Sequence, residues 1–194
     1  MTRRVFVFTT ALLGVLGCQA AWAQSASTPA APAQAAPLPS APQSTSATYG
    51  DWVLNCQRIG DAPAQKKLCE VTQTLAAKGQ TSPIARIALG RLAANDTLRF
   101  TVQMPVNVAP ATVPRLQIGD KVAGATALVW QRCVPAGCFA SVPLDDAALQ
   151  RVKGSQDQGR IVFHDGADRE ATLPMSARGL AQALDALAKE DAAK

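Results

Sequence analysis

Apolar and polar residues alternate most regularly between positions 97 and 104. Leu98, Phe100, Val102 and Met104 occupy every second position, with polar side chains between them. A period of two predicts a β-strand with one face in the core and the other in solvent. Shorter apolar runs bounded by turn residues predict further strands at residues 52–56, 68–75, 84–92, 116–118, 125–133, 138–142, 160–164 and 170–173. The chain is therefore predicted to be mainly β.

Two helices are predicted in the C-terminal third. Asp145 can cap the first, and Gly154 ends it. The second runs from Ser176, a candidate N-cap, to about Ala188, and carries leucines at i, i+4 and i+7 starting from Leu180. This stripe is expected to lie on a sheet. Many short strands with two helices favour a β-sandwich with helices packed on it.

The N-terminus has the pattern of an export signal. Arg3 and Arg4 precede an apolar run from Val5 to Gly17, which is shorter than the roughly 20 residues of a membrane anchor. The small-x-small pattern at residues 21–23 predicts cleavage between Ala23 and Gln24. No stable transmembrane span is expected after cleavage.

A lipoprotein signal is a rival interpretation of this segment. Val15-Leu16-Gly17-Cys18 resembles the motif in which the cysteine becomes lipidated. Leu16 is bulky at a position that usually carries a small residue, so simple secretion is preferred and lipidation at Cys18 is kept as the minority alternative.

Composition changes sharply after the signal. Residues 24–48 hold five prolines, a single leucine and no charge, so they cannot bury enough apolar surface to offset the entropy of ordering. The predicted organisation is a signal peptide at 1–23, a disordered Ala/Pro/Ser-rich tether at 24–48, one β domain at 49–188 and a tail at 189–194.

The charge of the chain is mildly basic. Removing residues 1–23 takes away Arg3 and Arg4 and no acids, so the formal charge falls from +5 to +3. The remaining basic residues are scattered rather than clustered, which predicts no nucleic-acid partner.

Four cysteines remain after the signal, namely Cys56, Cys69, Cys133 and Cys138. An even number in an exported protein favours disulfides, and four cysteines allow three pairings. We predict Cys56–Cys69 and Cys133–Cys138 because both are local, and the second closes a loop containing Pro and Gly. The chain-entropy model gives each such loop roughly 2–3 kcal/mol of stabilisation.

The remaining residues form no recognisable catalytic or metal-binding pattern. Cys133 and Cys138 are separated by four residues and lie between predicted strands, unlike a Cys-x-x-Cys redox motif at a helix start. His164 is the only histidine, so no zinc ligand set remains once the cysteines are oxidised. The Asp145-Asp146 pair fits helix capping. No catalytic residue, metal or cofactor is predicted.

Three large or titratable side chains have simpler expected roles. Trp52 and Trp130 are predicted to fill the core near the disulfides, with ligand stacking as the alternative. His164 follows Ile161 and Phe163 with the alternation of a strand, so it is expected to point to solvent.

Four blocks resemble the invasion-associated locus B family of bacterial envelope proteins. They are Tyr49-Gly50-Asp51-Trp52 with Cys56, Leu68-Cys69-Glu70-Val71-Thr72-Gln73, Cys133-Val134-Pro135-Ala136-Gly137-Cys138-Phe139-Ala140, and Leu180-Ala181-Gln182-Ala183-Leu184-Asp185-Ala186-Leu187. This resemblance implies an immunoglobulin-like β-sandwich in the periplasm or medium, without a cofactor or recognised catalytic residue.

The resulting functional hypothesis is a non-enzymatic exported envelope protein that binds a macromolecular partner, an unknown protein or envelope component. The family is named for host-cell invasion by some pathogens, so a link to invasion or virulence is included. Two alternatives stay open: a periplasmic enzyme for thiol-disulfide exchange or wall hydrolysis, and a small-molecule carrier, which needs a deep apolar pocket.

Overall fold

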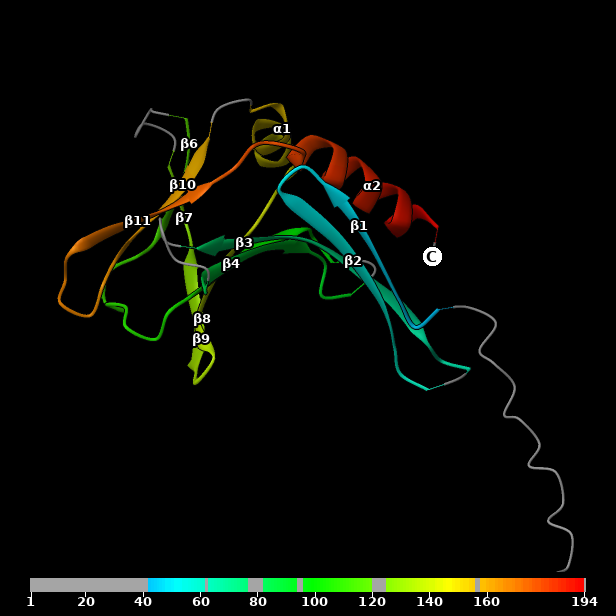
Figure 1. Cartoon of the computed structure of the whole chain (residues 1–194), viewed down its shortest axis with the longest axis horizontal. Helices are drawn as coiled ribbons and strands as arrows, with labels where there is room; N and C mark the ends of the chain where they lie inside the picture. Colours follow the sequence, from blue (N-terminus) through cyan, green and yellow to red (C-terminus); the bar gives the residue numbers. More distant parts are fainter. Residues whose placement is uncertain are drawn as a thin grey trace, which may run out of the picture. The chain divides into compact units, whose positions relative to one another are not determined.

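The strands form two antiparallel sheets in the computed structural model of the chain (Figure 1). The larger sheet has the order β1 (Ser44–Tyr49), β2 (Trp52–Ile59), β3 (Lys66–Ala76), β4 (Pro83–Gly90), β5 (Arg99–Met104), β9 (Gly137–Pro143) and β8 (Val129–Val134). The smaller has the order β11 (Glu170–Met175), β10 (Gly159–His164), β6 (Arg115–Ile118) and β7 (Thr126–Ala127). The helices are α1 (Asp146–Gly154) and α2 (Leu180–Ala192).

The structure describes residues 42–61, 63–76, 82–93, 96–119, 125–155 and 158–193, all within one unit, Pro39–Lys194. The predicted cleavage between Ala23 and Gln24, the alternative lipidation at Cys18 and residues 24–41 of the predicted tether lie outside the described residues.

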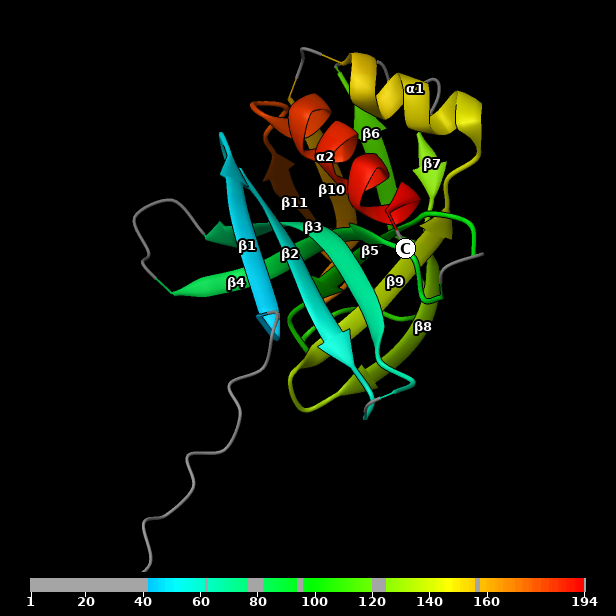
Figure 2. The same ribbon diagram turned by 90° about the vertical axis from the view of Figure 1, so that its right-hand side faces the viewer.

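The core lies between one face of the larger sheet and a second layer made by α2 and the smaller sheet (Figures 1 and 2). Phe100, Val102 and Met104 of β5 point into it and are at most 1% exposed, as the alternation from residue 97 to 104 predicts. Three leucines of α2 are also buried, at positions 180, 184 and 187. The prediction of a mainly β, sandwich-like domain with packed helices is therefore confirmed.

One predicted strand divides between the two sheets. Residues 125–133 form β7, which pairs with β6, and β8, which pairs with β9. Leu128 lies between them, is fully buried and donates its backbone N–H to the Pro114 carbonyl at 2.8 Å. The chain passes from the smaller sheet to the larger one at Leu128. The pattern of apolar residues does not reveal this change of sheet, because it is apolar on both sides of Leu128.

The last helix begins three residues later than predicted. The N-cap of α2 is Gly179, with a left-handed φ of 85° and no side-chain cap, rather than Ser176. A Cβ at Gly179 would lie 2.0 Å from the Tyr49 carbonyl oxygen, so the residue permits a close approach of two backbones. Ser176 instead uses its hydroxyl outside the helix, and the helix continues to Ala192.

The tether boundary was predicted too late. Residues 44–48, assigned to the tether, belong to β1, which pairs antiparallel with β2. Their side chains are exposed, so no alternation of burial marks the strand. Backbone hydrogen bonds to β2 hold it, and its sequence of small polar residues looks like that of a linker.

A polar junction ties the start of the sheet to the start of α2. The Ser176 hydroxyl donates to Asp51 Oδ2 at 2.6 Å, and the Arg178 guanidinium donates to both carboxylate oxygens of Asp51. The Asp51 N–H also donates to the Arg178 carbonyl at 3.1 Å. The Arg178 guanidinium, followed by the Ser176 hydroxyl, lowers the pKa of the Asp51 carboxyl.

A second carboxyl with a lowered pKa lies in the β10–β11 turn. The guanidinium of Arg169 donates two hydrogen bonds to Asp165 Oδ2, at 2.9 and 2.6 Å, and lowers the pKa of Asp165 to about 2. The backbone N–H groups of Arg169 and Ala167 also donate to this carboxylate. Both carboxylates therefore stabilise the folded chain in their charged form.

We expect acid to destabilise the domain through Asp51 and Asp165. A lowered folded-state pKa contributes stability that is present above the unfolded value, about 3.8, and is lost as pH falls through the folded value. Urea unfolding followed between about pH 5 and pH 2 should show a smaller loss of stability in Asp51→Asn/Asp165→Asn than in the parent. Asp61→Asn, in an exposed loop, is the control and should show the same pH dependence of unfolding free energy as the parent. The same pH dependence in the parent and both variants would contradict the role given to Asp51 and Asp165.

Candidate functional site

Two disulfides link neighbouring strands at directly opposed positions. Cys56 of β2 is bonded to Cys69 of β3, and Cys133 of β8 to Cys138 of β9. Cys56 and Cys69 are 3% exposed and lie on the core side of the sheet. The two disulfides thus hold together the β2–β3 pair, beside the edge strand β1, and the β8–β9 pair at the opposite edge of the larger sheet.

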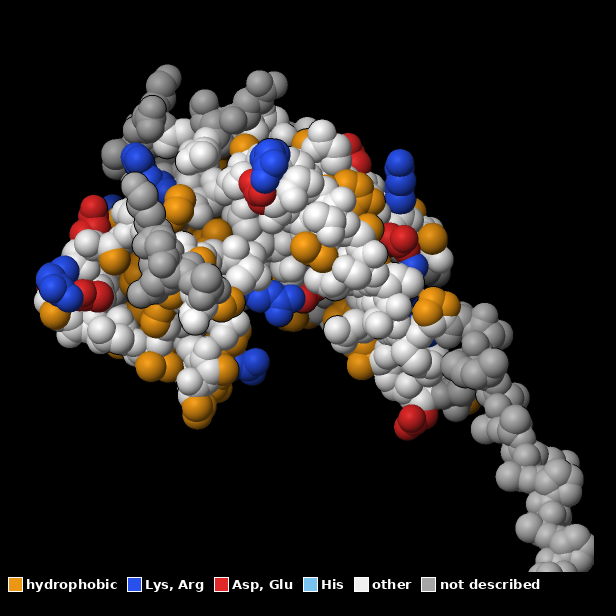
Figure 3. All heavy atoms as spheres, viewed as in Figure 1, with side chains coloured by type: hydrophobic (Ala, Val, Ile, Leu, Met, Phe, Trp, Pro, Cys, Tyr) orange, Lys and Arg blue, Asp and Glu red, His pale blue; other side chains and the backbone are white. Residues whose placement is uncertain are grey.

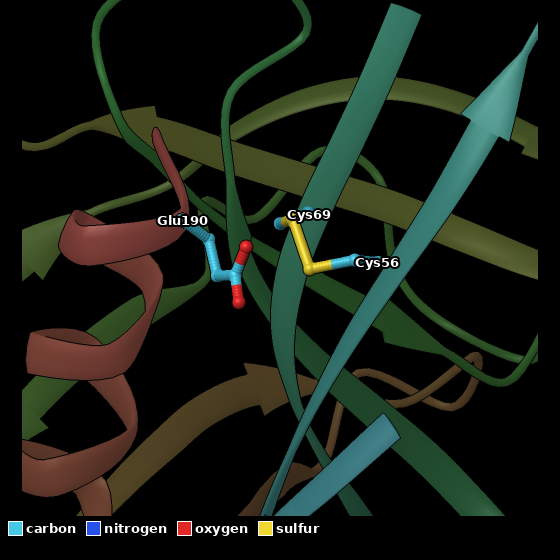
Figure 4. Close-up of side chains that lie close together, drawn as sticks. All are labelled: Cys56, Cys69 and Glu190. Carbon is cyan, nitrogen blue, oxygen red and sulfur yellow. A yellow bond between two sulfur atoms is a disulfide. The ribbon is translucent and has the colours of Figure 1, made fainter. Parts of the chain in front are cut away.

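Glu190 of α2 points toward the Cys56–Cys69 disulfide (Figure 4). Its carboxylate and the two sulfur atoms lie within 4.8 Å of one another, a grouping with the elements of a metal site. Each sulfur is committed to the S–S bond, so neither is the free thiolate through which cysteine binds zinc. Glu190 accepts a hydrogen bond from Lys67 of β3 instead. The group therefore joins α2 to the β2–β3 pair.

His164, Asp145 and the two tryptophans each have contacts of their own. His164 is half-buried at the end of β10, and its Nδ1 lies 2.8 Å from Asp168 Oδ1. Asp145 Oδ1 accepts the Ala148 N–H at 2.6 Å, so it caps α1 as predicted. Trp52 is fully buried, whereas Trp130 is only partly buried and donates its indole N–H to the Thr112 carbonyl at 3.0 Å.

One face of the larger sheet is covered by none of the described helices or strands of the second layer. We call it the open face; it is formed by alternate residues of the paired strands, and Figure 3 shows it hollowed between the ends of β2–β3 and the β8–β9 hairpin. Its residues are Val53, Asn55, Glu70, Thr72, Arg86, Ala88, Arg99, Thr101, Arg132, Phe139 and Ser141.

The centre of the open face is a row of small side chains. Thr72, Ala88, Thr101 and Ser141 are direct neighbours across β3, β4, β5 and β9. Thr72 and Ser141 are only 5% and 4% exposed although they lie on the face without a second layer. Small side chains along one row make a floor on which another chain can approach the sheet closely.

Longer polar side chains flank this floor. Arg86 Nη2 donates to Glu70 Oε1 at 2.5 Å, and Arg99 Nη1 donates to Ser141 Oγ at 3.5 Å. Toward β8, the Arg132 guanidinium lies 5.7 Å from the centre of the Phe139 ring. Three arginines and one glutamate among these residues give the open face a positive charge.

A hollow of about 260 Å³ lies at one end of the open face. Asn55, Glu70, Arg99 and Thr101 line it, and Ile59 and Leu92 stand at its margin, 50% and 74% exposed. The hollow combines hydrogen-bonding groups with apolar contact surface, the mixture found at protein-binding surfaces.

A second hollow, of about 490 Å³, lies beside α1 and bears on the alternative of a small-molecule carrier. Its lining includes Leu116, Ile118, Leu144 and Val152. The volume suits a small ligand. Leu116, Leu144 and Val152 also belong to the buried core, and the carrier function stays a prediction.

Sequence reasoning did not single out the open face. The alternation from residue 97 to 104 places Thr101 on the polar side of a strand, but it does not link Thr101 to Thr72, Ala88 and Ser141. Such a link depends on the order in which the strands pair, which one sequence does not give.

Within the described ranges, none of the helices has the length and apolar character needed to cross a bilayer. No curated protein matches the sequence. The crystal structure of invasion associated protein B from Bartonella henselae is similar, with a TM-score of 0.62 and 20% sequence identity over 75% of this chain and 96% of that one. It shares the immunoglobulin-like sandwich fold. The model of the "Invasion associated locus B (IalB) protein" family matches residues 52–188, and the chain therefore belongs to this family.

Proposed function

We propose that this chain is a non-enzymatic exported envelope protein that binds a macromolecular partner on its open face. The observation that carries the proposal is the hollowed, positively charged sheet face, which lies opposite the side packed on α2 and the smaller sheet. A floor of small side chains edged by Arg86, Arg99 and Arg132 fits a partner with an acidic surface, because opposite charges steer association and fix orientation.

The family and the two disulfides fit an exported protein, since such bonds persist in oxidising compartments. We place the binding event in the periplasm or at the cell surface. A role in host-cell invasion or virulence is part of the proposal because the similar Bartonella henselae protein is described as invasion associated.

Thiol-disulfide exchange at Cys56–Cys69 has little support from the geometry. The Cys56–Cys69 sulfurs are 3% exposed and lie beneath α2, so an attacking thiolate has little access to them. Thiol counting on the native protein distinguishes exchange from a structural role: two easily reduced cysteines would favour exchange, whereas four inert half-cystines would favour binding.

Reversing one charge on the open face should remove partner binding. A photoreactive residue at Thr101, in the chain expressed in its native cell, is expected to crosslink the partner for identification by mass spectrometry. Adding Arg99→Glu should lower the recovered adduct at least about tenfold, because a repelling charge replaces an attracting one. Arg99 is half-buried at the sheet surface and outside the core, so the fold should persist.

The control variant is Arg151→Glu on α1, which makes the same charge change on an exposed helix away from the open face. It should leave crosslinking intact. Equal losses of adduct in Arg99→Glu and Arg151→Glu would show that net charge alone controls crosslinking. Crosslinking from a photoreactive residue on α1 but not from Thr101 would show that the partner does not bind the open face.

A further inference from the structure

β1 is an edge of the larger sheet whose backbone is paired on one side only (Figure 2). The Arg58 N–H donates to the Gln43 carbonyl at 2.9 Å, so the opposed residues Gln43 and Arg58 form a hydrogen-bonded pair. Successive residues of a strand direct their backbone groups to opposite sides. Thr45, Ala47 and Tyr49 therefore bond to β2, as Gln43 does. The backbone groups of the alternate residues, Ser44, Ser46 and Thr48, face away from the sheet.

The other edges of the two sheets carry features that discourage pairing. β8 contains Arg132 and a register irregularity between Trp130 and Arg132. β11 contains Glu170 and Pro174, and β7 has two residues. Charges, prolines, irregularities and short length are the usual means by which edge strands avoid pairing with other chains. β1 has six residues with no charge, no proline and no register shift.

We propose that β1 pairs antiparallel with β1 of a second copy of this chain, around a two-fold axis at Ser46. Ser46 would then oppose its own counterpart, and Ser44 would oppose Thr48 of the second copy. Each opposed pair exchanges two backbone hydrogen bonds, so Ser44, Ser46 and Thr48 all find partners. The two larger sheets would become one continuous sheet with both open faces on the same side.

The sequence of β1 is complementary to itself in this arrangement. Every outward-bonding residue carries a hydroxyl, and cross-strand Ser and Thr pairs are favourable. On the other face of the sheet, Thr45 would lie opposite Ala47 of the second copy. Both side chains are small and uncharged. In a two-fold contact the same surface of each copy forms the interface, so the assembly is complete with two copies.

The segment before β1 is a poorer occupant of this edge. It contains Pro29, Pro32, Pro37 and Pro39, and proline has no backbone N–H to donate to a strand partner. A second copy supplies an uninterrupted set of donors and acceptors. Because one pair of six-residue strands is a small contact, the dimer is expected to be weak, with a Kd in the micromolar to millimolar range.

Sedimentation of the full exported chain over a concentration series tests the proposal. We expect a monomer–dimer equilibrium in the parent. Ser46→Lys and Ser46→Glu should each raise the dimer Kd at least about tenfold, because like charges meet at the two-fold axis. The side chain of Ser46 is exposed, so neither variant should disturb the fold. An equimolar mixture of the two variants should recover the dimer, since opposite charges then meet.

Gln131→Lys places the same charge on the exposed β8 edge and should leave the Kd unchanged. Amide hydrogen exchange adds a local measurement: Ser44, Ser46 and Thr48 should become protected as concentration rises. A chain that remains monomeric at about 1 mM would overturn the proposal. So would a dimer that survives Ser46→Lys but not Gln131→Lys, or a variant mixture that stays monomeric.

Discussion

Trp52→Ala is expected to lose about 3–5 kcal/mol of unfolding free energy, the range for large aromatic side chains deleted from a core. Trp52 is fully buried at the start of β2. Its indole N–H donates to the Ser176 carbonyl at 2.9 Å, so the variant also removes a hydrogen bond between residues 124 positions apart in the sequence. Urea unfolding monitored by circular dichroism measures the change.

Two variants separate the contributions to this loss. Trp52→Phe keeps most of the buried ring and should cost less, because it leaves the Ser176 carbonyl unpaired without opening a full cavity. Trp130→Ala removes an indole that is only partly buried, and its loss should also be smaller. A loss for Trp130→Ala equal to that for Trp52→Ala would contradict the difference in burial between the two side chains.

Removing the Cys56–Cys69 bond is expected to cost about 3 kcal/mol, and removing Cys133–Cys138 about 2 kcal/mol, from the entropy of the loops alone. The two bonds span sequence separations of 13 and 5. The paired variants Cys56→Ala/Cys69→Ala and Cys133→Ala/Cys138→Ala test this order by chemical unfolding. Alanine avoids burying a hydroxyl group at Cys56, Cys69 and Cys138, each at most 3% exposed.

The two paired variants should differ in unfolding free energy by more than loop entropy alone predicts. Cys56 and Cys69 are both enclosed, so their removal also leaves unfilled space beside α2. In the second bond only Cys138 is enclosed, because Cys133 is exposed on the β8–β9 hairpin. A larger loss of unfolding free energy on removing Cys133–Cys138 than on removing Cys56–Cys69 would contradict this expectation.

The parts of the fold that were predicted are those in which burial leaves a pattern in the sequence. Phe100 and Val102 alternate because one face of β5 lies in the core, and the leucines of α2 repeat because one side of the helix lies on the sheet. β1 leaves no such pattern, because its side chains are exposed and its stability comes from backbone pairing. The true start of α2 depends on the contact of Gly179 with Tyr49, which is distant in sequence.

The candidate site was harder to predict for a related reason. Its floor joins Thr72, Ala88, Thr101 and Ser141 from four strands, and these residues become neighbours only through the strand order β3-β4-β5-β9. Each residue alone is an ordinary small side chain. Cysteine spacing, by contrast, pointed to local pairs because both bonds join strands that are consecutive in the sequence.

The junction of Asp51, Ser176 and Arg178 joins the beginning of the domain to its final helix. During synthesis the interior of the domain therefore stays incomplete until α2 is available, because Leu180, Leu184 and Leu187 complete the layer over β2 and β3. A chain that stops short of Leu180 would leave that apolar layer facing water and is expected to aggregate rather than form a smaller domain.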